Sequence, residues 1–253
     1  MAELGEISLE LLDPQNCNPR DILSMAETYR EVYRTDSEWL EEFQCPNCRK
    51  VFGPTNNRVV QGILVCNGCA GPVPLVEMWT IRNILMEDFY GQISQRENFV
   101  CSLARLPSGR IIGFCWGYLA SAKTLEKKTT GAKGLARELN QRFGQKLYAY
   151  QKEAVVLPEF QRHGLGSLLI WLRNQAFATL LPNGIALFQT LADPPSKSYH
   201  LFVEKIGYQI CHRFFHPEEQ RQKIFAAMTI PNINTIFSQN LNTRFGLNFS
   251  NDD

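Results

Sequence analysis

The stretch "EAVVLPEFQRHGLGSLLI", Glu153 to Ile170, decides the fold of this chain. It combines the end of an apolar strand, a turn with glycines spaced G-x-G, and a helix with an apolar stripe. The first turn of a helix leaves its N–H groups unpaired and carries about half a positive charge, so it can bind a phosphate. Gly164 and Gly166 leave the backbone bare at this point. The alternative interpretation is that the two glycines only shape a tight turn.

The segments before this stretch predict a strand, helices and a hairpin. Ile7 to Leu12 is expected to be a short strand, and Pro19 to about Phe43 a helix capped by Asn18. A second amphipathic helix is expected from about Val76 to Gln95, after a segment rich in cysteine. From Asn98 the pattern changes to a strand hairpin with "PSG" as its turn.

The remaining segments complete the order of elements. Lys123 to Lys146 carries seven Lys and Arg against two Glu and is expected to be a partly helical insert. After the opening stretch, "IALFQTL" predicts a strand, Ser196 to Ile206 a helix, and "YQICHRFF" and "KIFAAMTI" two further strands. Asn232 to Asp253, rich in asparagine, is expected to be a loosely held tail. This order predicts an α+β domain with a mixed sheet.

Three segments in this order resemble the GCN5-related N-acetyltransferase (GNAT) family. The G-x-G turn matches the family pattern Q/R-x-x-G-x-G/A at Gln161, Gly164 and Gly166. The run "GRIIGFCWGYL" is similar to the paired strands that precede this motif, and "HLFVEKIGYQI" to the family's late L-Y-E-K-L-G-F segment. The resemblance implies a GNAT-like mixed, mostly antiparallel sheet flanked by helices, with acetyl-CoA as the cofactor.

The resemblance also implies which residues bind the cofactor. The main chain of Val155, Val156 and Leu157 is expected to pair with the pantetheine arm as another strand would. The N–H groups of the turn and the first helical residues are expected to hold the diphosphate, with Gln161 from the motif. The residues of this turn are Arg162, His163, Gly164, Leu165, Gly166 and Ser167.

Acetyl transfer to an amine needs a base, because a lysine-like amine with a pKa of about 10.4 is mostly charged at pH 7. Glu153 lies in the strand that would carry the thioester, three residues before Val156, and is the candidate base. The alternative for Glu153 is a solvated strand residue paired with a neighbouring lysine. The backbone N–H of Val156 is the candidate donor to the thioester oxygen.

The sequence identifies the general acid less clearly than the base. In the resembled family the donor to the departing thiol is often the Tyr of L-Y-E-K-L-G-F, and the matching residue here is Val203. Tyr199 lies four residues earlier on the same helix face and is the candidate replacement, with packing of its ring under the coenzyme or in the core as the alternative. The other three histidines, His200, His212 and His216, follow no catalytic or ligand spacing and are expected to be structural.

Four of the eight cysteines have the spacing of a metal site. Cys45 and Cys48, and then Cys66 and Cys69, form C-x2-C-x17-C-x2-C, which is typical of a structural Zn²⁺ site with four thiolates. The run "RVVQGILV" between them predicts a small strand pair, so this segment resembles a zinc ribbon. The alternative is four unrelated reduced cysteines. We expect residues 1–44 and 77–230 to form the acetyltransferase domain, 45–76 the inserted ribbon and 231–253 the C-terminal tail.

Composition narrows the function classes. A net charge of +1 with 20% charged and 44% apolar residues indicates neither a strong field for nucleic acid nor the low hydrophobicity and high charge of a disordered chain. Neither a signal peptide nor a run of about 18 apolar residues is present, so a soluble, cytoplasmic protein is expected, without a membrane partner.

Two functions remain open at this stage. The first is an acetyl-CoA-dependent N-acetyltransferase that moves an acetyl group to an amine acceptor, either a small molecule or a protein, by direct attack. The second is a protein- or nucleic-acid-binding module, in which the ribbon and the basic insert at 123–146 bind the partner and the acetyltransferase core is impaired. A solvated face is the simplest interpretation of the basic insert.

Overall fold

The structure is a computed structural model. It describes residues 7–14, 17–34, 43–44, 47–48, 51–52, 58–60, 63–66, 68–71, 98–217 and 220–245. The helix expected at 76–95 and the part of the first helix beyond Arg34 lie outside the described residues. So does Cys45, one of the four predicted zinc ligands.

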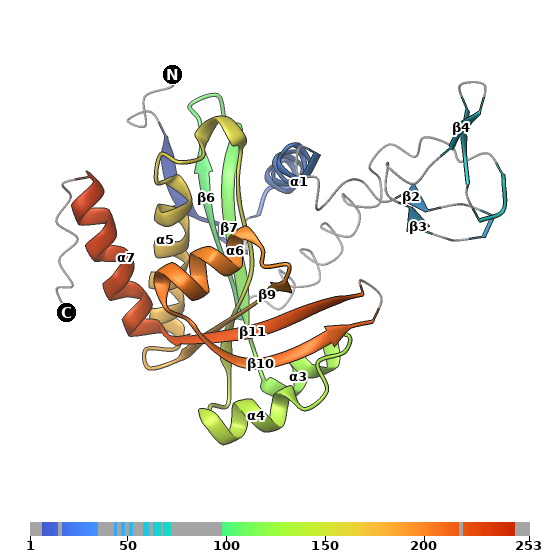
Figure 1. Cartoon of the computed structure of the whole chain (residues 1–253). Helices are drawn as coiled ribbons and strands as arrows, with labels where there is room; N and C mark the ends of the chain where they lie inside the picture. The colour runs from blue at the N-terminus through green and yellow to red at the C-terminus, as the bar shows by residue number, and fades with distance from the viewer. Residues whose placement is uncertain are drawn as a thin grey trace.

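A seven-stranded sheet forms the centre of the molecule (Figure 1), with the order β1-β6-β7-β8-β9-β11-β10. Its strands are β1 (Ser8–Leu11), β6 (Phe99–Arg105), β7 (Ile111–Ala120), β8 (Tyr148–Val156), β9 (Ile185–Asp193), β10 (Gln209–His216) and β11 (Arg221–Thr229). All neighbouring strands run antiparallel except β8 and β9, which are parallel. This confirms the predicted α+β class with a mixed, mostly antiparallel sheet.

Helices cover both faces of the sheet. The described helices are α1 (Pro19–Arg34), α3 (Ala122–Lys128), α4 (Leu135–Arg142), η5 (Pro158–Phe160), α5 (Leu165–Leu180), α6 (Lys197–Tyr199), the π-helix η6 (His200–Ile206) and α7 (Ile230–Phe245). Buried residues of α1, α3 and α4 pack on one face, which we call the α1 face. Buried residues of α5, η6 and α7 pack on the other, the α5 face.

Short-range contacts explain where the first helices begin. The backbone N–H of Arg20 donates to Oδ1 of Asn18 over 2.9 Å, which confirms the predicted cap of α1. Ser121 caps α3 in the same way, by accepting from the N–H of Thr124 over 3.1 Å. The carboxylate of Glu126 in α3 then accepts from the N–H of Ala136 in α4 over 2.7 Å. The insert at 123–146 is therefore partly helical, as predicted.

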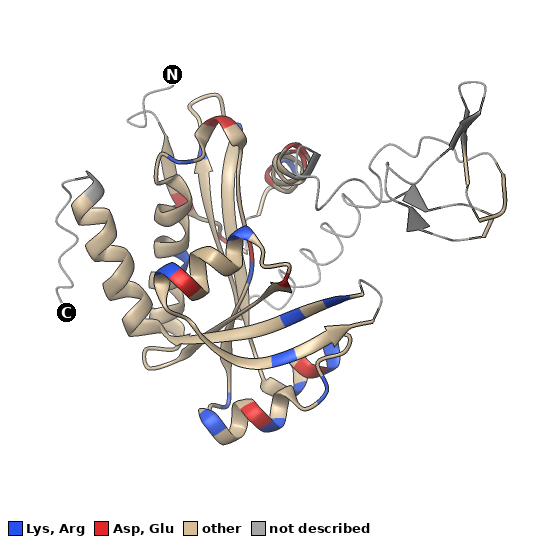
Figure 2. Ribbon diagram, in the orientation of Figure 1, with Lys and Arg blue, Asp and Glu red and all other residues tan. Residues whose placement is uncertain are grey.

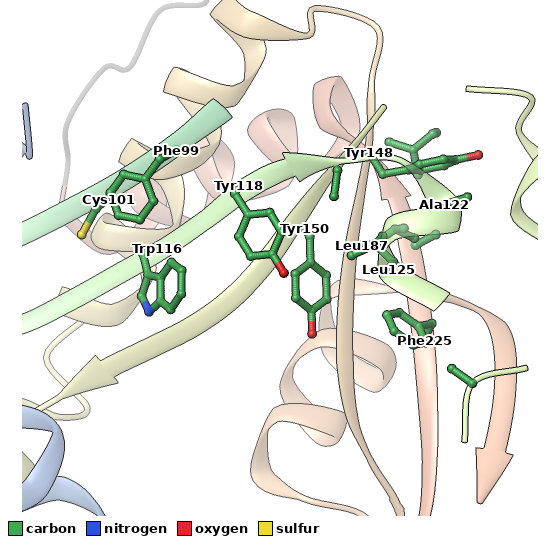
Figure 3. Packing of buried hydrophobic residues seen from close by; sticks show 14 of the residues in the cluster. Phe99, Cys101, Trp116, Tyr118, Ala122, Leu125, Tyr148, Tyr150, Leu187 and Phe225 are labelled. Atoms are coloured by element: carbon green, nitrogen blue, oxygen red, sulfur yellow. The ribbon is translucent and has the colours of Figure 1, made fainter. Parts of the chain in front are cut away.

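Aromatic side chains from adjacent strands form much of the core on the α1 face (Figure 3). The rings of Phe99, Trp116, Tyr118, Tyr150 and Phe225 form a continuous row across β6, β7, β8 and β11. Successive ring centroids are 5.4 to 6.2 Å apart, within the range of favourable aromatic pairs. This row fixes the strands on which the candidate site is built.

The prediction of a loosely held tail from Asn232 is wrong as far as Phe245. Residues 230–245 form α7, which packs against α5. Ile233, Phe237 and Leu241 recur every four residues and are buried. Asparagine has a low helix propensity, but the burial of this apolar stripe outweighs that preference.

Two further hairpins border the cysteine pairs. β2 (Phe43–Gln44) pairs with β3 (Val51–Phe52), and β4 (Arg58–Val60) with β5 (Ile63–Val65). The second pair confirms the strands predicted from "RVVQGILV". Among the described residues, no helix has the length and apolar character needed to cross a bilayer.

Candidate active site

β8 and β9 separate part way along their length. Their ladder runs from Ala149 and Ala186 to Gln151 and Phe188. Beyond this point β8 remains paired with β7, and β9 remains paired with β11. The described part of the chain provides no strand between the two diverging segments. We call this opening the strand fork, formed by residues 152–156 of β8 and 189–193 of β9.

A bulge in β8 lies where the strand fork begins. Trp116 pairs with Glu153 and Gly117 pairs with Gln151, which leaves Lys152 as an extra residue in β8. A bulge of this kind bends its strand and increases the local twist. A Cβ atom at position 117 would collide with the carbonyl oxygen of Tyr150, so only glycine allows this approach of β7 to β8. The bulge therefore accounts for the divergence of β8 from β9.

At the end of β8, the main-chain groups of every second residue point toward the strand fork. The N–H of Leu157 donates to the carbonyl of Ile112 in β7 over 2.9 Å. In an antiparallel ladder neighbouring residues of one strand point their N–H groups to opposite sides. The N–H of Val156, the residue before Leu157, therefore points away from β7 and lies on the fork side. The Val156 carbonyl accepts from Nε2 of Gln161 over 2.8 Å. The Leu157 carbonyl also has a donor, the N–H of Phe160, at 2.9 Å, so Leu157 is the weakest of the expected pantetheine partners.

The start of α5 carries the residues that were predicted to bind the diphosphate, 161–167, and we call this segment the phosphate cradle. Gly164 has a left-handed backbone with φ of 89° and precedes the helix without a side-chain cap. The N–H of Leu168 makes the first helical hydrogen bond, to the Gly164 carbonyl. The N–H groups of Leu165, Gly166 and Ser167 precede that bond and point out of the helix start. No acidic residue lies in this first turn, so the positive end of the helix dipole is not neutralised there.

The phosphate cradle adjoins the strand fork. A Cβ atom at Gly166 would lie 3.7 Å from Cγ2 of Val156, the last residue of β8. That is ordinary van der Waals contact, so the fold itself would tolerate alanine at this position. Arg162 and His163 are both exposed at the rim, and Arg162 has a φ of 65°. The strand edge and the bare helix start are thus neighbours in space.

Glu153 is half-buried and faces the aromatic row. Glu153 pairs with Trp116 of β7, and side chains directly opposite each other in a ladder share a face of the sheet.

Burial raises the pKa of the Cys115 thiol to about 11. The charge of nearby Arg173 lowers this pKa, and the charge of Glu153 raises it further. Cys115 therefore remains a protonated thiol at neutral pH and is no candidate nucleophile.

Tyr199 and Val203 lie on the α5 face of the sheet. Both are partly buried against the core of that face. The N–H of Tyr199 donates to Oγ of Ser196 over 3.1 Å, which fixes the start of α6. Glu153 and Tyr199 thus lie on opposite faces of the sheet. Whether Tyr199 is the general acid stays a prediction.

Two of the histidines have carboxylate partners. Nδ1 of His200 lies 2.7 Å from Glu204, one helical turn away. Nδ1 of His212 lies 3.0 Å from Glu138 of α4. Both are remote from the phosphate cradle in sequence, and both contacts fit the structural roles that were expected.

A buried polar network that the sequence did not predict lies at the base of the strand fork. The hydroxyl of Tyr208 donates to Oε1 of Gln151 over 3.2 Å, and Nε2 of Gln151 donates to Oδ1 of Asn174 over 3.0 Å. All three side chains are buried. Burial raises the pKa of Tyr208 strongly, so this phenol is a poor acid. In the sequence, the signal that could have indicated this network is a polar residue within a mostly apolar element, Gln151 in β8 and Asn174 in α5.

Arg173 lies beside this network and was also missed. Its side chain is 1% exposed, and Nη1 donates to the carbonyl of Trp116 over 3.4 Å. Nε and Nη2 are buried and make no hydrogen bond of good geometry among the described residues, although Arg173 lies close enough to Cys115 to lower the pKa of that thiol. A buried cation with so few partners is costly, and such groups concentrate at functional sites. The base of the strand fork therefore carries a fixed positive charge.

Three of the four predicted metal ligands come together. The sulfur atoms of Cys48, Cys66 and Cys69 all lie within 4.8 Å of one another. Cys48 comes from one cysteine pair and the other two come from the second pair. These residues belong to the small hairpin segment and not to the strand fork.

Comparison with known proteins gives structural similarity alone. No protein-family model and no curated protein sequence matches this chain. An acetyltransferase assigned to the GNAT family from Desulfovibrio desulfuricans aligns with a TM-score of 0.48 at 11% identity, over 88% of this chain and 99% of its own. NAA60 from Arabidopsis thaliana, solved with acetyl-CoA, aligns with a TM-score of 0.49 at 12% identity, over 89% and 99%.

A third similar structure is the PaiA N-acetyltransferase from Thermoplasma acidophilum, solved with coenzyme A. It has a TM-score of 0.48 at 9% identity, over 88% of this chain and 99% of its own. Each TM-score is below 0.5 and each identity is near 10%, so these likenesses do not say what the present chain binds or acts on.

Proposed function

We propose that this chain is an acetyl-CoA-dependent N-acetyltransferase that transfers the acetyl group directly to an amine. The observation that carries the proposal is the strand fork beside the phosphate cradle. β8 leaves β9 after Gln151, and the same strand ends next to the bare helix start at Gly164. An extended ligand with amide groups at one end and a diphosphate at the other fits this arrangement.

The residues present match the two parts of such a ligand. The carbonyl of Val156 faces the strand fork and, with a second lone pair beside its bond to Gln161, can accept from a ligand amide as a neighbouring strand would, which leaves the N–H of Val156 for the thioester oxygen. The N–H groups that begin α5, from Leu165 to Ser167, can hold a diphosphate, with Arg162 adding a positive charge at the rim. Acetyl-CoA, when bound, supplies the acetyl group as a thioester.

Two groups of the chain would act on the reacting atoms. The carboxylate of Glu153 would accept a proton from the acceptor ammonium, directly or through water, because a charged amine is not a nucleophile. The N–H of Val156 would donate to the thioester oxygen as negative charge builds on it. Glu153 and Val156 lie on the same strand, so their relative positions are fixed by the sheet.

Proton return to the departing thiol is assigned to Tyr199. Val203 at the usual tyrosine position cannot donate, and burial makes Tyr208 a poor donor. A thiol with a pKa of about 8.5 leaves with little help, so the loss of Tyr199 should reduce the rate modestly.

The described structure does not favour the binding-module alternative. Figure 2 shows basic residues on α3, α4, β10 and β11, with acidic residues between them on α3 and α4. Two side chains of the basic insert already have partners: Lys128 lies over the ring of Tyr118, and Arg142 donates to the carbonyl of Ile210. A mixed face with engaged charges is a weak polyanion site. Zn²⁺, the second predicted cofactor, has no role in the transfer chemistry and stays a proposal of its own.

The test is calorimetric titration of the full chain with coenzyme A. Gly164→Ala should weaken binding at least tenfold, because a side chain at this left-handed position crowds the phosphate cradle. The matched control is Gly109→Ala in the β6–β7 turn, where φ is 86° and a Cβ atom meets nothing within 4 Å. Both substitutions should cost about 1–2 kcal/mol of stability. Gly109→Ala should leave the affinity unchanged.

Two results would count against the proposal. The first is no heat of binding for the unmodified chain at millimolar coenzyme A. The second is equal affinity of the Gly164→Ala and Gly109→Ala variants. Binding of RNA with a steep salt dependence, and without any effect of coenzyme A, would support the binding module instead.

A further inference from the structure

We propose that Cys48, Cys66 and Cys69 bind a structural Zn²⁺ ion, separate from the strand fork. The three cysteines come from two C-x2-C pairs. Cys45, the partner of Cys48 in the first pair, is the fourth ligand that the sequence provides. Four thiolates would leave the ion no open position for substrate or water.

The distances between the sulfur atoms fit a shared metal ion. Sγ of Cys48 lies 3.6 Å from Sγ of Cys66, and the three sulfur atoms are within 4.8 Å of one another. A disulfide needs about 2.05 Å between sulfur atoms, so Cys48 and Cys66 are not disulfide-bonded to each other. Zn–S bonds of about 2.3 Å in a tetrahedron place the sulfur atoms about 3.8 Å apart. The separation of 3.6 Å between Cys48 and Cys66 is close to this value, and the 4.8 Å limit on the other two separations is compatible with it.

The second cysteine pair has the tight loop that directs two sulfur atoms toward one point. The N–H of Gly68 donates to Sγ of Cys66 over 3.2 Å. The N–H of Ala70 donates to the Cys66 carbonyl, and the N–H of Cys66 to the Gly71 carbonyl, each over 2.9 Å. An N–H donor to sulfur favours the thiolate that a metal requires. Ala70 takes a φ of 56°, so the chain accepts local strain to close this loop.

The two cysteine loops also touch each other. A Cβ atom at Gly71 would lie 2.6 Å from Nδ2 of Asn47 and 3.4 Å from Sγ of Cys69. Asn47 belongs to the first C-x2-C pair, so the first loop reaches the second loop at Gly71. Cys66 is 1% exposed, whereas Cys48 and Cys69 are exposed, which gives the cluster an inner and an outer side.

The strands that the structure describes around the cluster are short. β2 and β3 are each two residues long, and β4 and β5 are each three. Isolated hairpins of this size are unstable in water, and small modules use a metal ion or disulfides in place of a core. Thiolate ligands select Zn²⁺ over hard cations such as Mg²⁺ and Ca²⁺. Metal binding would thus be coupled to the folding of this segment.

The experiment measures the metal content of the full chain, purified under reducing conditions, by elemental mass spectrometry. The unmodified chain should carry about one zinc per chain, as expected for a tetrathiolate site. Cys48→Ser, Cys66→Ser and Cys69→Ser should each lose the ion on dialysis against a chelator. Cys17→Ser is the matched control, because Cys17 is a cysteine that lies outside the cluster, and it should keep the zinc. Replacement by Co²⁺ should give the absorption bands of a tetrahedral thiolate site.

Several outcomes would overturn this inference. They are zinc content far below one per chain even after refolding with zinc, zinc retained by all three cluster variants, iron in place of zinc, or a disulfide within the cluster. The inference does not depend on the proposed acetyl transfer. Gly164→Ala should lose coenzyme binding and keep its zinc, whereas Cys66→Ser should lose zinc and keep coenzyme binding, so the two proposals can fail separately.

Discussion

Glu153 is the residue whose chemistry depends most on its neighbours. Its place opposite Trp116 follows from the bulge at Lys152, because a β8 strand without an extra residue would turn Glu153 to the other face. On the observed face it lies beside the aromatic row and at the strand fork. A carboxylate in this position can reach an amine that approaches from the α1 face.

Under the proposed function, Glu153→Gln should lower kcat by about 100-fold or more, since general-base catalysis contributes that much. The substitution keeps the shape of the side chain, so the dissociation constant for coenzyme A should stay within a factor of about three. Raising the pH should restore part of the rate, because the acceptor amine then loses its proton without help. Release of free thiol from acetyl-CoA, with polyamines and peptides as acceptors, is the measurement.

Glu159→Gln is the control for this variant, since Glu159 is an exposed carboxylate of η5 just beyond β8. It should leave kcat unchanged. Turnover by Glu153→Gln at the unmodified rate would remove Glu153 from the mechanism.

At the scale of elements, the bulged contact between β7 and β8 decides whether the strand fork opens. Gly117 is the residue that permits it, because any side chain would meet the backbone of Tyr150 and the ring of Phe177. Neither neighbour is a flexible side-chain end, so the strands themselves would have to move.

Gly117→Ala should therefore destabilise the fold by about 1–3 kcal/mol, the usual cost of overpacking. The midpoint of urea unfolding is the measurement. Gly166→Ala is a suitable comparison for stability alone, since its added methyl would meet Val156 only at 3.7 Å. Equal midpoints for the two variants would show that the approach of β7 to β8 is looser than the structure indicates.

At the scale of the whole molecule, α7 covers α5 and completes the α5 face. Phe237 is buried, and Nε1 of Trp171 in α5 donates to Oγ of Ser238 over 3.2 Å. α5 also carries the phosphate cradle at its start. The C-terminal helix thus supports the element that the proposed site depends on.

Phe237→Ala should lower the free energy of unfolding by about 3–5 kcal/mol, because it leaves a cavity between two helices. Asn240→Ala, on the exposed side of the same helix, should change it by no more than about 0.5 kcal/mol. Thermal and urea unfolding of both variants give the comparison. A loss below about 1 kcal/mol for Phe237→Ala would mean that α7 contributes little to the fold.

The sequence by itself determined the features that depend on neighbouring residues. The strand, turn and helix around Gly164, the β6–β7 hairpin and the cap at Asn18 were all predicted, because hydrophobic period, turn residues and capping act over a few positions. The spacing within each cysteine pair is also a feature of neighbouring residues, so the sequence alone contains it. The order of the elements was sufficient to predict a mixed sheet with helices.

Only the tertiary structure decided the features that join distant parts of the chain. The bulge at Lys152 requires the exact pairing of β8 with β7, and the network from Tyr208 through Gln151 to Asn174 joins a turn, a strand and a helix. The docking of α7 likewise depends on α5, which lies some 60 residues earlier. A sequence pattern indicates which face of a helix or strand is apolar. It does not indicate against which other element that face packs, because this depends on how the side chains of both elements fit together.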